Sequence, residues 1–300
     1  MNIIEIKYKD YRAKINVSSG ANCISLINDK YGADILHTPD YSEKLYNPYV
    51  YGMPILYPVN RISDGRFDFE GRKYVFPVNE GKTNCHLHGT LHCTPFSVCE
   101  KGDSFVKCVY EGIYPGFSHQ FRIEICYELS DCGLKQIVKI TNLSQYNMPN
   151  LLGFHTTFNL PFVKCSSEEN IRVYADVCDE IERNSLYLPT GKILPDDEIT
   201  KNFRCGMFNP HNTSVSRHYK GKGNIELYDK IVGIKVVYET DEKYKYRMFY
   251  KDVNDKFICL EPMNCMVNCP NSPFGRELAN FDYIEPNSSK TYVSKIYVEK

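Results

Sequence analysis

Four short segments of this 300-residue chain place chemically useful polar side chains inside otherwise strand-like or turn-rich sequence. The first covers residues 60–67, with the sequence NRISDGRF, and follows an apolar run. A guanidinium is a rigid fork of five donors, so Arg61, beside Asn60, could grip hydroxyl or carbonyl-like oxygens in a cleft. The alternative is that Arg61 closes its own loop by pairing with Asp64.

The second segment covers residues 84–89 (NCHLHG) and is followed closely by His92 and Cys93. Histidine and cysteine are common ligands of zinc and other soft metals, and His86 and His88 would point the same way on a strand. However, no third ligand follows at an established zinc spacing, and no carboxylate stands where a cupin-like ligand set would need one. The pattern therefore favours one catalytic or substrate-binding histidine with structural neighbours over a metal site.

The third and fourth segments each centre on one ionisable residue. His155 lies in residues 153–160 (GFHTTFNL); a lone histidine in such a run is usually a buried core residue, but a general acid near neutral pH also needs this setting. Glu261 lies in residues 257–264 (FICLEPMN), where four apolar residues lead into the carboxylate and Pro262 is expected to end the strand. A buried glutamate is costly unless it is paired or used. Together the two side chains would make a complete pair of general base and general acid.

The elements that must position these side chains are predicted to be strands. The chain has 24 Tyr and 16 Phe, which favour half-buried pleated surfaces. Apolar and polar residues alternate in residues 11–17 and 121–129, and turn residues at 130–133 predict a hairpin with a second strand through Ile140. Further strands are expected at residues 233–239, 246–250, 257–260 and 291–298.

No stretch sustains a helical apolar stripe for three turns with caps at both ends. Short strands with turn signals over the whole length predict an all-β fold, a large antiparallel sandwich with few or no helices. Since no repeat, low-complexity tract or flexible linker marks a boundary, we expect one domain over residues 1–300.

Composition narrows the range of partners and compartments. The formal net charge is −1, from 36 Lys and Arg against 37 Asp and Glu, and no basic block stands out, which argues against a nucleic acid or an anionic membrane as the main partner. The N-terminus is charged within a few residues, and no apolar span is long enough to cross a membrane. The 13 Cys form an odd, irregularly spaced set, so we expect a cytoplasmic protein that uses cysteine as a small buried hydrophobe.

Taken together and in this order, the four segments resemble the aldose 1-epimerase family of galactose mutarotase-like proteins. Weaker signposts at residues 114–116 (YPG), 133–134 (GL), 141–142 (TN) and 189–191 (PTG) extend the resemblance over nearly the whole chain. The resemblance implies an antiparallel β-supersandwich with a sugar cleft on one open face. It also implies an enzyme that interconverts the α and β anomers of an aldose.

The resemblance implies a role for each matching residue. Glu261 would be the general base that takes the proton from the C1 hydroxyl, and His155 would be the general acid that protonates the ring oxygen and opens the ring. His88 and Arg61, with Asn60, would hold the sugar. The partner would be a small-molecule aldose, and neither a metal nor an organic cofactor would be needed, because side chains perform both proton transfers. Whether the protein is a monomer or a homodimer does not follow from the sequence.

The chain departs from the family pattern at several positions. Family members often carry an aspartate that binds a sugar hydroxyl; in residues 215–219 (VSRHY) Ser216 stands at that position, and Asp229 is a nearby alternative. Thr90 replaces a glycine that usually follows Leu-His-Gly, and Phe96 stands where a tryptophan is often found. These changes leave the acid and the base in place but do not support galactose in particular as the substrate.

Three alternative functions stay open on the sequence. A hexose-6-phosphate 1-epimerase would use the same mechanism with extra cations around the cleft, for which Arg66, Arg72 and Arg217 are candidates. A non-catalytic sugar-binding or sensing domain would keep the fold without the reaction; the missing aspartate favours this function, whereas the retained acid and base oppose it. A metal-dependent enzyme would be built on the histidines of residues 86–92.

Overall fold

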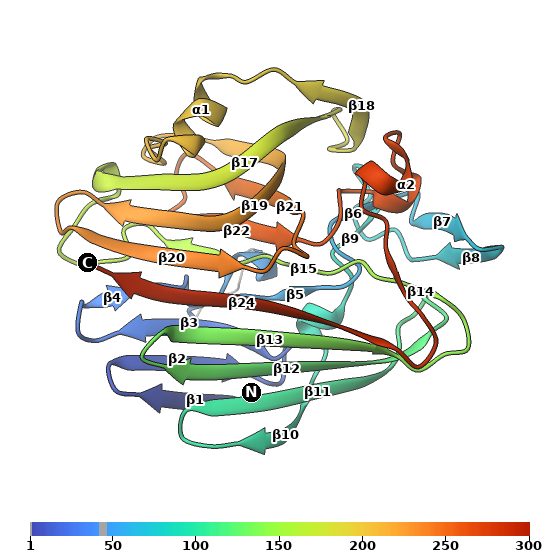
Figure 1. Cartoon of the computed structure of the whole chain (residues 1–300), viewed down its shortest axis with the longest axis horizontal. Coiled ribbons are helices and arrows are strands. Elements are labelled where there is room, and N and C mark those ends of the chain that lie inside the picture. Colours follow the sequence, from blue (N-terminus) through green and yellow to red (C-terminus); the bar gives the residue numbers. More distant parts are fainter. Residues whose placement is uncertain (1, 42–46) are drawn as a thin grey trace.

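The structure, a computed structural model, describes residues 2–41 and 47–300 of the chain. Antiparallel strands dominate these residues, and the two α-helices among them are short (Figure 1). The all-β fold class predicted from the sequence is therefore confirmed.

A long antiparallel sheet runs through the molecule and carries fourteen of the described strands. Its main path, from one edge to the other, is β10 (Ser97–Lys101), β11 (Phe105–Ile113), β12 (Gln120–Ser130), β13 (Gly133–Asn142), β24 (Ser289–Glu299), β20 (Ile234–Thr240), β19 (Val215–Asp229), β21 (Tyr246–Lys251), β22 (Phe257–Met263), β15 (Gly153–Phe154) and β5 (Ile55–Leu56). Three strands lie off this path: β16 (Thr157–Asn159) on β22, β17 (Ile171–Arg183) on β19, and β18 (Pro189–Leu194) on β17. The C-terminal strand β24 lies between β13 and β20 and so joins the two halves of the sheet (Figure 1).

A second sheet of four described strands packs against one half of the long sheet. Its strands, in spatial order, are β1 (Ile3–Tyr8), β2 (Tyr11–Asn16), β3 (Asn22–Asn28) and β4 (Ala33–Asp34). Contacts join β1 and β2 to the β11–β13 part of the long sheet. The backbone N–H of Val298 in β24 also donates to the Tyr11 hydroxyl at 2.9 Å, which ties the two sheets together.

Shorter elements connect the sheets. The two-stranded pairs are β6 (Arg61–Ser63) with β9 (Cys85–Leu87), β7 (Arg66–Phe69) with β8 (Arg72–Val75), and β14 (Met148–Pro149) with β23 (Tyr283–Ile284). The helical elements are α1 (Glu198–Arg204), α2 (Gly275–Leu278) and the 3-10 turns η1 (Pro48–Val50), η2 (Leu91–Cys93), η3 (Glu168–Asn170) and η4 (Cys269–Asn271).

The predicted hairpin and the other predicted strands are confirmed. β12 and β13 pair from Phe121 opposite Asn142 to Ser130 opposite Gly133. The apolar residues of β12 that were expected to share a face are buried, and the residues between them are at least partly exposed. The remaining predicted strands correspond to β2, β20, β21, β22 and β24.

One predicted boundary is wrong, because β22 does not end before Pro262. The strand runs from Phe257 to Met263, and all seven of its residues are buried. Pro262 has no N–H, but it lies opposite the interruption between β15 and β16, where β22 has no ladder partner on that side. Glu261 is therefore inside a buried strand rather than at its mouth.

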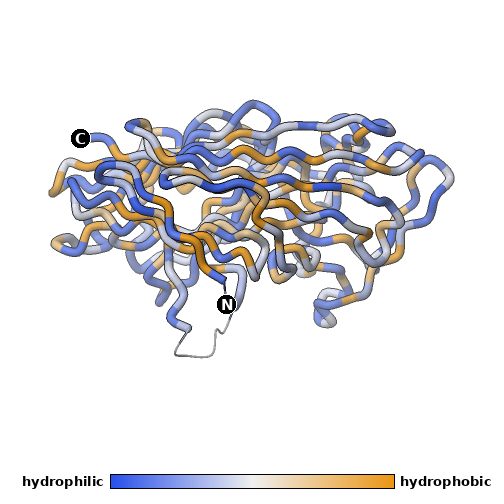
Figure 2. Tube along the Cα trace, turned by 90° about the horizontal axis from the view of Figure 1, so that it is seen from below, coloured by the Kyte–Doolittle hydropathy of each residue, from blue (hydrophilic) through white to orange (hydrophobic). Residues whose placement is uncertain are grey.

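The core follows from the alternation of side chains along the strands. Polar and apolar stretches alternate along much of the chain trace in Figure 2. Buried apolar residues from both sheets form one continuous cluster, and a small second cluster lies around Val50 and Phe257. Because β22 is buried along its whole length, any polar side chain on it is enclosed by this core.

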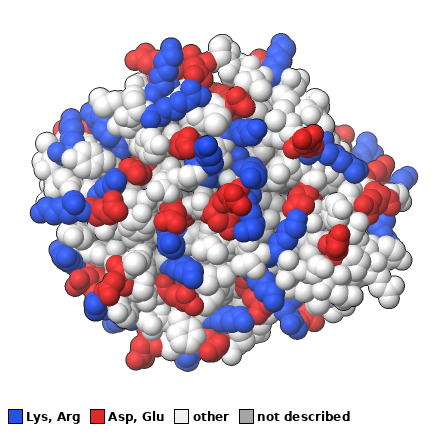
Figure 3. Space-filling view, viewed as in Figure 1, with Lys and Arg blue, Asp and Glu red and all other residues white. Residues whose placement is uncertain are grey.

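The surface and the cysteines only partly match the expectations from composition. Acidic and basic side chains are interspersed over the face shown in Figure 3, without a large area of one sign.

All 13 Cys are free; six are buried, one is partly buried and six are exposed, so the expectation of buried cysteines is wrong for the exposed six. None of the helices in the described residues is long and apolar enough to cross a membrane.

Candidate active site

His155 and Glu261 face each other across neighbouring strands. Glu261 lies in β22, opposite Met248 of β21. On the other side of β22, His155 and Thr156 separate β15 from β16, and the register on either side places His155 opposite Glu261. Nε2 of His155 lies 3.4 Å from Oε1 of Glu261, and the two side chains are 8% and 2% exposed. The structure thus brings together the two residues that were expected to act as acid and base.

Burial shifts the pKa of both side chains toward the uncharged form. Burial raises the pKa of Glu261 from 4.5 to about 8, although the positive charges of Arg183 and Arg61 act in the opposite direction. Burial lowers the pKa of His155 from 6.5 to about 3. Between these two values the pair holds a single proton, which can sit on either side chain without changing the total charge.

His88 reaches this pair from the turn after β9. Its backbone N–H donates to the carbonyl oxygen of Asn60 at 3.0 Å, and its ring lies edge-on to the His155 ring with 5.5 Å between centroids. The next residue, Gly89, has a φ of +64°, and a Cβ there would lie 2.1 Å from the carbonyl oxygen of Tyr57. Only glycine therefore fits after His88, which explains the Leu-His-Gly sequence as a backbone requirement.

Tyr49, in η1, covers the histidines. Its ring lies 4.6 Å from the ring of His88 and 4.7 Å from the ring of His92, which belongs to η2. The distance from the Tyr49 ring to the His155 ring is 6.1 Å, all three being measured between centroids. Burial lowers the pKa of His92 to about 4 and holds the pKa of His88 well below 6.5, so the imidazoles are uncharged at neutral pH.

Around the pair of His155 and Glu261, four buried polar atoms have no hydrogen-bond partner among the described residues. They are Nδ1 of His88, Nδ1 of His92, Nδ1 of His155 and Oε2 of Glu261, and we call these four side chains the polar cluster. An unsatisfied buried polar atom costs about 1–3 kcal/mol, and protein interiors contain few of them. Four such atoms together indicate a place for a ligand with several hydrogen-bonding groups.

Arg61 is anchored by Glu80 rather than by Asp64. Nε and Nη2 of Arg61 each donate to a carboxylate oxygen of Glu80 at 2.7 Å, whereas Asp64 accepts from the side-chain amide of Asn84. The alternative in which Arg61 closes its loop on Asp64 is therefore wrong. The bidentate pair fixes the guanidinium, whose Cζ lies 4.7 Å from the centre of the Tyr187 ring.

The side chain of Asn60 is turned toward its own loop. Asn60 is buried with a φ of +56°, and its Oδ1 accepts from the backbone N–H of Arg61 at 3.0 Å. Its Nδ2 lies 3.8 Å from Sδ of Met263. The amide thus stabilises the turn that carries Arg61, and its contact with a substrate stays a prediction.

Arg183 carries no local sequence signal, yet it lies close enough to Glu261 for its positive charge to lower the pKa of that carboxyl. It ends β17, and its Nη2 donates to the carbonyl oxygen of Ser216 at 2.6 Å and to Oγ of Ser216 at 3.1 Å. Its Cζ lies 5.8 Å from the centre of the Tyr187 ring, which Arg61 also contacts. Desolvation and the nearby Arg61 charge lower the pKa of Arg183 to about 10.

The two positions proposed for the missing aspartate lie at opposite ends of β19. Ser216 is beside Arg183, as described above. Asp229 is fully buried at the other end of the strand, where its Oδ1 accepts from the backbone N–H groups of Ile231 and Val232 at 3.0 Å. Asp229 caps a turn and is therefore excluded as a substitute.

His86 differs from His88 in having both ring nitrogens engaged. Nδ1 of His86 lies 2.8 Å from the carbonyl oxygen of Pro77, and Nε2 lies 3.1 Å from the hydroxyl of Tyr114. These contacts make His86 a core histidine. In the part of the chain that the structure describes, no group of three or more His, Cys, Asp or Glu side chains is arranged to hold a metal ion.

The three arginines considered for a phosphate group are occupied or exposed elsewhere. Arg217 forms ion pairs with two carboxylates, at 2.6 and 2.8 Å. Cζ of Arg72 lies over the ring of Tyr146, and the side chain of Arg66 is 71% exposed. None of the three shows an unpaired, buried guanidinium that would favour a phosphate ligand.

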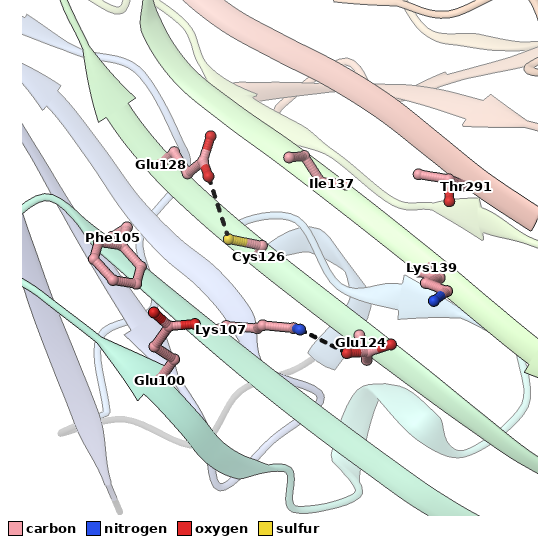
Figure 4. Close-up of a pocket in the computed structure, with 9 residues that line it drawn as sticks. All are labelled: Glu100, Phe105, Lys107, Glu124, Cys126, Glu128, Ile137, Lys139 and Thr291. Carbon is pink, nitrogen blue, oxygen red and sulfur yellow. Dashed lines mark hydrogen bonds and ion pairs between the residues drawn. The ribbon is translucent and has the colours of Figure 1, made fainter.

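A hollow of about 500 Å³ lies on β10–β13 and β24, and none of the residues that line it belongs to the polar cluster (Figure 4). Two pairs of its side chains are in contact: Nζ of Lys107 lies 2.7 Å from Oε1 of Glu124, and Sγ of Cys126 lies 3.8 Å from Oε1 of Glu128. None of the unsatisfied buried atoms in the described residues belongs to it. This hollow is a grooved sheet surface and not the candidate site.

Comparison with known proteins found one matching family model and several similar solved structures. The sequence model of the aldose 1-epimerase family matches residues 3–281. A galactose mutarotase-like protein from Clostridium acetobutylicum is 31% identical, with a TM-score of 0.95 over 99% of this chain and 95% of that one.

Two more distant structures share the fold. A galactose mutarotase-like protein from Lactobacillus casei is 16% identical, with a TM-score of 0.75 over 99% of this chain and 100% of that one. A galactose 1-epimerase from Lactobacillus acidophilus is 13% identical, with a TM-score of 0.70 over 99% of this chain and 98% of that one.

Proposed function

This chain belongs to the aldose 1-epimerase family, and we propose that it interconverts the α and β anomers of an aldose by opening and reclosing the sugar ring. The observation that carries the proposal is the buried pair of His155 and Glu261, 3.4 Å apart, next to unsatisfied polar atoms. A carboxylate and an imidazole at this distance can act on two neighbouring oxygen atoms of one substrate.

The proposed reaction moves one proton in each direction and leaves the enzyme unchanged. The carboxylate of Glu261 takes the proton of the C1 hydroxyl while the protonated His155 gives a proton to the ring oxygen, and the bond between C1 and the ring oxygen breaks. The product is the open-chain aldehyde. After rotation about the C1–C2 bond, His155 takes back the proton as the hydroxyl attacks the other face of C1, and Glu261 returns its proton to the former carbonyl oxygen.

The environment of the pair suits this exchange. Burial favours the uncharged form of both groups, so the proton of the resting pair sits on Glu261. In the reactive form the proton sits on His155 before ring opening and on Glu261 afterwards, and the total charge of the pair is the same in both states. Burial raises the pKa of Glu261 to about 8 and lowers the pKa of His155 to about 3, which keeps one proton on the pair over the whole range between. Ring opening therefore converts the charged pair into the uncharged pair that the low-polarity surroundings favour, with no change in total charge.

Other residues of the site would hold the sugar. Nδ1 of His88 is free to bond a hydroxyl, and Arg61 is held in one orientation by Glu80. The Tyr49 ring lies over the imidazoles, so a bound sugar must displace this ring or pack beside it. Sugars commonly pack their apolar face against an aromatic ring, which gives Tyr49 a role in binding.

Mutarotation assays test the proposal. Freshly dissolved anomers of several aldoses are followed by polarimetry, and the exchange at equilibrium is followed by saturation-transfer NMR, with Glu261→Gln as the control variant. We expect acceleration by the native protein and its loss in the variant. Binding of sugars without any acceleration would instead indicate a recognition domain that has kept the fold.

A further inference from the structure

We propose that the substrate is an aldose with a single negative charge, in chemical class a hexuronic acid, and that Arg183 binds its carboxylate. This inference rests on the proposed function, because it names the class of sugar that the same site would take.

The first observation is that Arg183 is a half-buried cation without an anionic partner. Only its Nη2 atom has hydrogen-bond partners among the described residues, and both belong to Ser216. No carboxylate of those residues lies within ion-pair distance of it, whereas Arg61, Arg204 and Arg217 each have at least one. A partly desolvated guanidinium with free donors is seldom left so unless a ligand uses it.

The second observation is the place of Arg183 relative to Glu261. Ser216 lies opposite Tyr250, and Tyr250 lies opposite Cys259, two residues before Glu261 on the same face of β22. From the usual spacing of strands and residues, the backbones of Ser216 and Glu261 are about 12 Å apart. Both side chains extend from the same face of the sheet, so a sugar bound between them can contact the guanidinium and the proton pair together.

The third observation is the balance of charge. Arg61 is neutralised by Glu80, the pair of His155 and Glu261 holds one proton, and the other two imidazoles of the polar cluster are uncharged. Arg183 thus leaves the site with one positive charge. One carboxylate balances this charge, and its two oxygens match the planar guanidinium, whereas a dianionic phosphate would leave a negative charge unpaired.

The residue identity at position 216 also supports a negatively charged substrate. Ser216 stands where the family resemblance predicted an aspartate, and it binds the guanidinium of Arg183. A positively charged donor therefore faces the region in which a negatively charged acceptor was expected. A substrate group that accepts hydrogen bonds and carries negative charge fits this donor.

The experiment compares sugars that differ only at one carbon. Mutarotation of D-glucuronate and D-galacturonate is measured against D-glucose and D-galactose, with glucose 6-phosphate as the dianionic probe. We expect kcat/KM for the better uronate to exceed that for its neutral counterpart about 10- to 100-fold, the range for hydrogen bonds to a charged group. Arg183→Gln should remove most of this preference, and Arg183→Lys should retain part of it.

A matched control variant distinguishes binding of the carboxylate by Arg183 from a general effect of removing one positive charge from the protein. Arg122, on β12, pairs with Glu111 at the surface, and Arg122→Gln should leave the ratio of uronate to neutral sugar unchanged. Thermal unfolding of each variant shows that the protein is folded. Neutral sugars turned over as well as uronates, or a preference for glucose 6-phosphate, would overturn the inference and leave the proposed function intact.

A binding measurement distinguishes the two proposals if no sugar is turned over. Saturation-transfer difference NMR with D-glucuronate then reports the binding site directly. Uronate binding that is lost in Arg183→Gln supports the inference while overturning the proposed reaction. Uronate binding that Arg183→Gln does not change, or no uronate binding at all, overturns the inference.

Discussion

Glutamine at position 261 keeps the size and hydrogen-bonding groups of Glu261 but cannot ionise. We expect Glu261→Gln to lose nearly all turnover and, at alkaline pH, to stabilise the protein. A residue that serves only the fold would behave differently, since its replacement lowers stability at every pH. The variant therefore separates a buried functional carboxylate from a structural one.

The size of the stability effect follows from the pKa of Glu261, which burial raises from 4.5 to about 8. Because the folded state holds the proton more tightly than the unfolded chain, the associated stability is complete below pH 4.5 and is lost as the pH rises through about 8. One pKa unit corresponds to about 1.4 kcal/mol, so the loss is on the order of 3 kcal/mol at neutral pH and on the order of 5 kcal/mol above the folded-state pKa. Glutamine has no such loss.

Urea unfolding of both proteins from about pH 5 to about pH 9 measures this difference. The free energy of unfolding should shift in favour of the variant by several kcal/mol over that range, while mutarotation falls about 10²- to 10⁴-fold and sugar binding persists. A stability difference that stays constant with pH refutes the reasoning about the buried carboxylate. Unchanged turnover refutes the role of Glu261 as the base.

The remaining predictions concern the proton pair and its neighbours. Activity should fall about tenfold per pH unit above about pH 8, where the pair of His155 and Glu261 loses its proton; a pH–rate profile that falls near the ordinary histidine pKa contradicts this. His88→Gln should remove most activity at little cost in stability, whereas His86→Gln should lower Tm and leave the folded fraction active; equal activity losses point to a shared structural or metal role instead. Tyr49→Ala should admit water and raise the pKa of His155 toward 6.5, which histidine NMR titration measures; an unchanged pKa means that Tyr49 does not cause the burial.

The strands that the sequence predicts are those whose side chains alternate without interruption. β12 and β13 pair over ten residue pairs without a register shift, so their period of two is visible in the sequence. β17 and β19 were not predicted, although they are the longest strands described. The register between them shifts twice, after Ala175 and after Val177, and β19 contains the polar, glycine-containing stretch 220–224. Bulges move side chains to the other face, which removes the alternation on which the prediction depends.

In the candidate site, too, some features are visible in the sequence and others are not. His155, Glu261 and His88 lie in short motifs whose neighbours are fixed by the backbone, as the close approach of Gly89 to Tyr57 shows. The sequence points to these residues because the motifs that carry them occur in an order that resembles one family, and the structure places the three side chains close together. The prediction that the strand ends before Pro262 was wrong. The gap between β15 and β16 leaves the position beside Pro262 without a ladder partner, and this gap is not visible in the sequence of β22 itself.

Arg183 and Tyr49 could not be predicted because their roles arise only from packing between distant segments. Tyr49 is separated from His155 by more than a hundred residues in the chain, yet their rings lie 6.1 Å apart. Arg183 resembles a surface arginine in the sequence and is bound to the backbone of Ser216 in the fold. The sequence therefore indicates the proposed acid and base more readily than the arginine that is proposed to bind the substrate.

The two proposals are linked through the charge of Arg183. This charge is the largest of those that oppose the raised pKa of Glu261. A carboxylate bound to Arg183 would offset that charge, and the pKa of Glu261 would then rise further. The bound substrate would therefore make Glu261 a stronger base and extend the range over which the pair keeps its proton. Since kcat reports the complex and kcat/KM the free enzyme, the alkaline limit of kcat for a uronate should lie above that of kcat/KM, whereas for a neutral aldose the two limits should coincide.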